Sequence, residues 1–148
     1  MVKFEVNKED VLKELDMLQN CISRMSTNSF ALKGWYVTVI TALFAFIFTA
    51  DRALIGKLLG VLIITTIVFW YLNSYYLLLE RKYRAQYEWV LENRIYSEEI
   101  STEKIFDLNV NGKSDEKFIS AMLSTTFKVL YILPLSIEVL VFMFIFIK

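Results

Sequence analysis

One acidic residue, Glu138, lies in the middle of a long apolar run. Glu138 is the single charge within residues 129–147, an otherwise uncharged apolar run. An ionised carboxylate at the centre of a bilayer costs about 2.5–3.5 kcal/mol on insertion scales, so this side chain must be protonated, paired or in contact with water. Two interpretations follow: a protonated glutamate bonded to a neighbouring helix, which stabilises packing, or one member of a carboxylate ring lining a cation-favouring pore in a symmetric oligomer.

Hydroxyl groups at similar depth in two further apolar runs are the expected partners of this acid. They belong to Thr38, Thr41, Thr65 and Thr66. Pro134 lies one turn before Glu138. Because proline lacks an N–H and frees the carbonyl of the residue four positions earlier, we expect a kink in the third run.

The composition of the chain excludes several common kinds of catalytic and metal site. The chain has no histidine and one cysteine, Cys21, which rules out histidine acid/base catalysis, Ser-His-Asp triads, Cys-His nucleophiles, His-containing zinc sites and an intrachain disulfide. Asp107, Asn109 and Asn111 match the opening of a calcium loop, but the last ligand position is Phe118 instead of glutamate. An Asx-rich turn explains this pattern better. We therefore expect that the protein is not an enzyme and that it binds no metal ion and no cofactor.

Three apolar runs must position the polar residues: 34–50, 58–79 and 129–147. A bilayer core about 30 Å thick needs roughly 20 helical residues, and each run fits that length without a polar face at helical spacing. The chain is 56% hydrophobic with a mean hydropathy of +0.46. These features predict an all-α membrane protein with three transmembrane helices, joined after the first by a short outer connection, 51–57.

The positive charges predict the orientation. Segments 1–33 and 80–128 carry five and eight of the sixteen Lys and Arg residues. The positive-inside rule places both segments in the cytoplasm and leaves the C-terminus outside.

The cytoplasmic segments have helical patterns. Asn7 can cap an amphipathic helix within residues 1–33 that runs into the first span, with Gly34 as its one weak point. Its apolar seam packs either on its own chain or against a second copy, and consists of Val11, Leu15, Leu18, Ile22 and Met25. Residues 80–96 extend the second span and are the natural partner of this helix.

The remaining segments are less regular. Within the polar segment 97–117, Phe106, Leu108 and Val110 alternate with polar residues, a short strand-like pattern. The last segment, 118–148, should belong to a helix that starts near Ser114 and continues to residue 147.

Two further surfaces could bind other molecules. Arg81, Lys82 and Arg84 lie just inside the predicted membrane and suit anionic lipid, or an anionic ligand such as a nucleotide. Small residues that allow close helix packing, within one chain or between chains, recur at Gly34, Thr38, Ala42, Ala45, Gly56 and Gly60.

Several short motifs in residues 15–90 resemble those of the SLATT-type transmembrane effectors of bacteria. They are Asn28-Ser29-Phe30, Lys33-Gly34-Trp35, Tyr75-Tyr76 and Glu80-Arg81. The resemblance implies a homo-oligomeric effector in the bacterial inner membrane, expected as a tetramer, that acts in antiphage defence. Its opening as a gated ion channel or pore would kill or arrest the infected cell under control of a nucleotide signal made by a partner enzyme. The alternative is a non-conducting membrane anchor that presents its cytoplasmic helices to a partner.

Overall fold

The computed structural model describes residues 7–96, 105–110 and 117–147, and every regular element in these ranges is a helix. The expected all-helical class, with three long apolar helices, is confirmed. The elements in chain order are α1 (Lys8–Thr49), α2 (Arg52–Val90), the π-helical turn η1 (Leu91–Ile95), α3 (Phe118–Met122), α4 (Thr125–Phe127), the π-helical turn η2 (Lys128–Ile132) and α5 (Leu133–Ile147).

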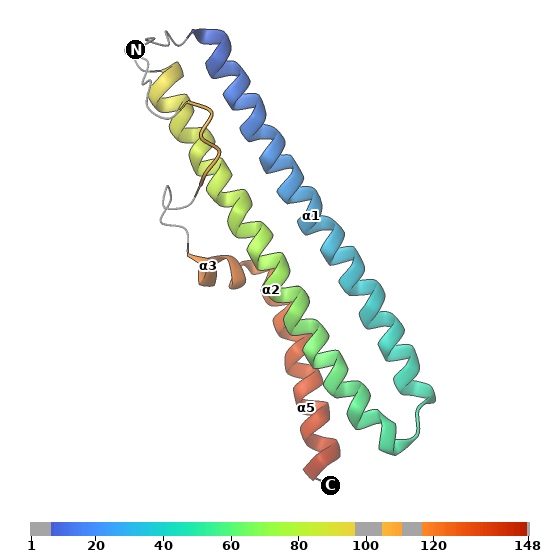
Figure 1. Cartoon of the computed structure of the whole chain (residues 1–148). Helices are drawn as coiled ribbons and strands as arrows, with labels where there is room; N and C mark the ends of the chain where they lie inside the picture. The colour runs from blue at the N-terminus through green and yellow to red at the C-terminus, as the bar shows by residue number, and fades with distance from the viewer. Residues whose placement is uncertain (1–6, 97–104, 111–116, 148) are drawn as a thin grey trace.

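Helices α1 and α2 form a long antiparallel hairpin (Figure 1). The Asn7 side chain caps α1 as expected, and Asp10 completes a reciprocal capping box. The helix continues through Gly34 without a break, so the amphipathic and apolar segments form one rod. The connection between the helices is shorter than the expected 51–57, because α2 already begins at Arg52.

The seam of α1 is used within the chain. All five residues are buried: Val11, Leu15, Leu18, Ile22 and Met25. The first three form a cluster with Val90 of α2, against which Tyr83 and Leu108 also pack. The structure therefore matches the first interpretation of the seam, packing on its own chain.

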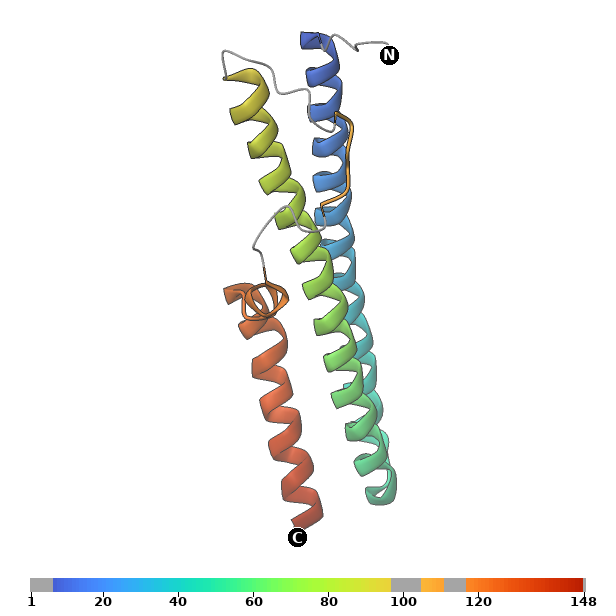
Figure 2. The same cartoon turned by 60° about the vertical axis from the view of Figure 1, so that its left-hand side comes forward.

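The third apolar segment is not the single helix that the sequence suggested. Its expected start near Ser114 lies outside the described residues, and the helix is interrupted at Leu123–Ser124. Trp70 Nε1 donates to the Met122 carbonyl at 3.1 Å, which satisfies one of the acceptors exposed at the end of α3. Figures 1 and 2 show α3 lying across the direction of α5.

Pro134 lies just after a π-helical turn in the third apolar segment. The π-helical turn η2 ends immediately before α5, whose second residue is Pro134. Since the missing proline N–H removes a bond to the Leu130 carbonyl, a wider turn at this position is the expected local response.

The strand expected around Phe106, Leu108 and Val110 is wrong for residues 105–110, which form no strand. Phe106 has a positive φ of 58°, and Asp107 Oδ1 accepts from the Asn109 N–H at 2.9 Å, an Asx-type turn. Val110 is buried, so apolar contacts fix this segment on the hairpin. Asn111, the third residue that matches the calcium-loop pattern, lies outside the described residues.

Three helices among the described residues are long and apolar enough to cross a membrane: Lys8–Thr49, Leu54–Ile95 and Thr125–Ile145. In the most apolar 18-residue window of each, only 11%, 17% and 11% of the residues are buried within the chain. Most of their apolar surface thus faces outward, as in a helix that contacts lipid. The start of α1 and the end of α5 lie at opposite ends of the molecule (Figure 1).

Leu18→Ala tests the packing of the seam. Leu18 is fully buried, so its truncation should lower the free energy of unfolding by about 2–5 kcal/mol. Leu12→Ala on the same helix is the matched control, because that side chain is 53% exposed. Thermal unfolding of the purified protein in detergent measures both; equal shifts for the two variants would contradict this packing.

Candidate functional site

Glu138 is buried in a polar layer to which all three long helices contribute. Its side chain is only 2% exposed, and both carboxyl oxygens lie 3.1 Å from Thr66 Oγ1 of α2. The hydroxyl of Tyr36, on α1, lies 3.3 Å from the same Thr66 oxygen. Because Thr66 has one hydroxyl proton and donates it to Glu138, the Tyr36 hydroxyl is the donor to Thr66. The result is a directed chain of hydroxyls that ends on the carboxyl group.

A second polar layer lies two turns along the same helices. Ser29 Oγ donates to Asn73 Oδ1, and Asn73 Nδ2 donates to the Tyr131 hydroxyl at 2.9 Å. The three side chains are buried and come from α1, α2 and η2. The Tyr36 and Tyr131 rings connect the layers, with their centroids 4.8 Å apart.

The two layers share a spacing of seven residues in every helix. Ser29 precedes Tyr36, Thr66 precedes Asn73, and Tyr131 precedes Glu138, each by seven positions. Seven residues make nearly two helical turns, so each pair lies on one face with about 10 Å between its members. This repeat was the signal in the sequence that could have identified Tyr36, Asn73, Tyr131 and Ser29, none of which we had predicted.

Only one of the four predicted threonines contacts Glu138. Thr65 is half-buried beside Thr66, whereas Thr38 and Thr41 are exposed on α1. Thr38 Oγ1 donates to the Gly34 carbonyl at 3.0 Å, and Thr41 Oγ1 to the Val37 carbonyl at 2.7 Å. These two hydroxyls are satisfied by their own helix and can face lipid or a channel without a further partner.

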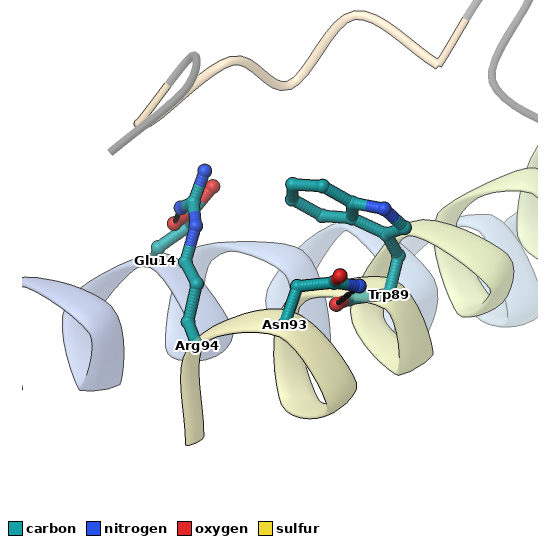
Figure 3. Close-up of polar contacts among 4 residues, drawn as sticks. All are labelled: Glu14, Trp89, Asn93 and Arg94. Atoms are coloured by element: carbon teal, nitrogen blue, oxygen red, sulfur yellow. Dashed lines mark hydrogen bonds and ion pairs between the residues drawn. The ribbon is translucent and has the colours of Figure 1, made fainter. Parts of the chain in front are cut away.

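A buried ion pair lies at the opposite end of the hairpin from the connection. Arg94 of η1 contacts Glu14 of α1, and both side chains are fully buried (Figure 3). The Arg94 guanidinium also lies 5.4 Å from the centre of the Trp89 ring. The backbone carbonyl of Trp89 accepts a hydrogen bond from Asn93 Nδ2 at 2.9 Å. Segment 105–110 passes over this group (Figure 3), so the pair fastens α1 to the end of α2 under a covering segment.

The predicted basic cluster has contacts within the chain. Arg81 Nη1 donates to Ser120 Oγ at 3.2 Å, and Arg84 forms an ion pair with Glu80 at 2.7 Å. Lys82 is half-buried. Two of the three basic residues thus stabilise the fold as well as placing charge beside the spans.

No cluster of histidine, cysteine or carboxylate side chains in the described part of the chain could hold a metal ion. Comparison of the chain with known proteins found no relative. No family model matches the chain, and no curated protein and no solved structure matches it. The polar layers, the exposed faces of the helices and the buried ion pair are therefore the observations from which a function must be argued.

Thr66→Val tests the deeper polar layer. The change leaves Glu138 without its donor and Tyr36 without its acceptor, so we expect a loss of about 0.6–2 kcal/mol of stability. Thr66→Val combined with Glu138→Leu should recover part of that loss, because no buried acid then remains unsatisfied. Thr65→Val is the matched control and should change little. Thermal unfolding of all four proteins measures this order, and equal effects of the two valine variants would refute it.

Arg94→Ala tests the buried ion pair. Removing one partner leaves the Glu14 charge buried, and the expected loss is about 3–5 kcal/mol. Arg84→Ala breaks an ion pair whose arginine is 60% exposed and should cost no more than about 1 kcal/mol. The comparison is made by thermal unfolding; similar losses for the two variants would show that the Glu14 contact does not fasten the hairpin.

Proposed function

We propose that this chain is a membrane effector that assembles into a symmetric homo-oligomer and conducts ions through a path lined by α1. One observation carries the proposal: α1 presents an exposed face of small and hydroxyl-bearing residues within its apolar run. At about 100° per residue these side chains fall within an arc of about 100°, and they are Gly34, Thr38, Thr41, Ala42, Ala45 and Thr49. We call this face the small-residue face.

The small-residue face is not used for packing within the chain. It lies opposite Tyr36, which points into the bundle, and large exposed apolar residues such as Val39 and Phe48 flank it. A Cβ added at Gly34 would meet no atom within 4 Å. Small residues let helix backbones approach closely, so this face suits contact with a second copy of α1.

Hydroxyls on the same face supply the polar lining that a conduction path needs. Thr38 and Thr41 are bonded to their own helix, and Thr49 Oγ1 likewise donates to the Phe46 carbonyl at 3.1 Å. Their oxygens remain available to passing ions or water. In this mechanism Glu138 braces the bundle from the opposite side and does not line the path.

The cytoplasmic hairpin would sense the signal. Because α1 is one continuous rod from Lys8 to Thr49, a movement at the Glu14 end is transmitted to the small-residue face. The resemblance to SLATT-type effectors supports antiphage defence and a nucleotide signal, and the bacterial inner membrane with a cytoplasmic N-terminus. The basic residues Arg81, Lys82 and Arg84 are the candidate contacts for such an anion.

Ion flux from liposomes and a membrane-potential dye in bacteria test conduction. Gly34→Leu and Ala45→Leu should abolish most of the flux, since they place bulk at exposed positions of the small-residue face. Val39→Leu, on a flanking face of the same helix, should retain it. Flux that is unchanged in all three variants, or absent from the unsubstituted protein under every activating condition, would overturn the proposal in favour of a non-conducting anchor.

Cross-linking tests the assembly separately. In a Cys21→Ser background, Ala45→Cys should give disulfide-linked dimers in membranes, whereas Ile137→Cys on α5 should not. Cross-linked protein without flux would support an oligomeric interaction module, and the absence of any cross-link would remove the basis for a pore, because three spans cannot enclose one.

A further inference from the structure

A groove of about 590 Å³ lies between α1 and the third apolar segment. Its volume is in the range of about 300–1,000 Å³ typical of small-molecule sites. One wall comes from α1 and the other from α4, η2 and the start of α5, and the lining residues are Lys33, Tyr36, Val37, Ile40, Thr41, Phe44, Thr126, Val129, Leu130 and Pro134.

We infer that this groove binds an anionic phospholipid, with one acyl chain along the groove and the phosphate at Lys33. The site is separate from the basic cluster at Arg81 and does not depend on ion conduction. It would make the chain selective for the headgroup of one lipid at a defined place, beyond the general attraction of a basic surface to a membrane.

The distribution of charge in the groove supports an anionic occupant. Lys33 is the one cation among the lining residues, and none of them is acidic. The Lys33 ammonium lies 5.6 Å from the centre of the Phe127 ring. Thr126, the residue before Phe127, is exposed, bears a hydroxyl group and lines the same groove. A phosphate can accept hydrogen bonds from both groups.

The length of the groove fits one acyl chain in one leaflet. Its α1 wall runs from Lys33 to Phe44, which is about 16 Å at about 1.5 Å per residue. Half of a bilayer core is about 15 Å thick. Lys33 directly precedes the first apolar run, so its ammonium would lie at headgroup level when the remaining lining residues lie in the hydrocarbon.

The polar layers explain why the groove exists. Tyr36 turns inward to Thr66, and its ring packs on Tyr131 at one edge of the groove, which fixes the distance between the two walls at that depth. Beyond this contact the walls carry Val37, Ile40 and Val129, and none of these fills the space between them. An acyl chain is the apolar filler that a bilayer supplies.

Lipid retention tests the site. The full-length protein is reconstituted in nanodiscs of equal phosphatidylglycerol and phosphatidylethanolamine, extracted in mild detergent and analysed by native mass spectrometry. We expect a bound phosphatidylglycerol in preference to phosphatidylethanolamine. Lys33→Gln should reduce that preference about fivefold, which corresponds to the roughly 1 kcal/mol that a lysine contributes near an anionic surface.

Two pairs of variants separate the groove from the general membrane surface. Val129→Trp fills the groove and should abolish retention of both lipids, whereas Ile137→Trp, at an exposed position of α5 outside the groove, should not. Lys57→Gln removes an exposed cation of α2 outside the groove and should keep the preference. Thermal unfolding confirms that each variant is folded before its lipids are counted.

Three results would overturn the inference. They are equal retention of the two lipids by the unsubstituted protein, an unchanged preference in Lys33→Gln, and efficient disulfide cross-linking between copies through Val129→Cys in a Cys21→Ser background. The last result would mean that a second chain occupies the groove. None of them bears on ion flux, which is measured separately.

Discussion

The hydrogen bond from Thr66 to Glu138 is the interaction on which the arrangement of the spans depends. Within a bilayer no water is available to satisfy a carboxyl group, so its partner must come from the protein. The bond requires α5 to lie against α2 at one depth and in one rotation, because the carboxyl group can reach Thr66 from no other face. Tyr36 then extends the same requirement to α1, and one buried acid sets the position of all three helices.

A single layer would leave the helices free to pivot about it, and the second layer prevents this. Ser29, Asn73 and Tyr131 repeat the three-helix contact about 10 Å away, and the contacting rings of Tyr36 and Tyr131 join the two levels. The π-helical turn η2 contains Tyr131 and ends just before Pro134. The local widening before the proline therefore coincides with the second layer, where it helps to set the position of the Tyr131 side chain against Asn73.

The sequence predicted what is local or periodic. The Asn7 cap, the uninterrupted α1, the buried seam from Val11 to Met25 and the three apolar helices follow from capping chemistry and spacing alone. It could not predict which threonine meets Glu138, because Thr65 and Thr66 differ only in the direction that the packed helix gives them. The break at Leu123–Ser124 and the Glu14–Arg94 pair also depend on contacts between distant segments. The strand expected near Leu108 was wrong because apolar alternation there reflects contact with the hairpin instead of pairing with another strand.

Within its apolar run, α1 has three faces, and each face lies in a different environment. Tyr36 faces the bundle, Ile40 faces the groove, and Thr38 faces outward with the other small residues. The polar layers occupy the bundle face, where their side chains are buried among the three helices. Conduction would require the outward face of several copies, and the groove beside it would then lie next to each contact between subunits. Thr41 belongs to both surfaces, because it lines the groove and lies at the edge of the small-residue face.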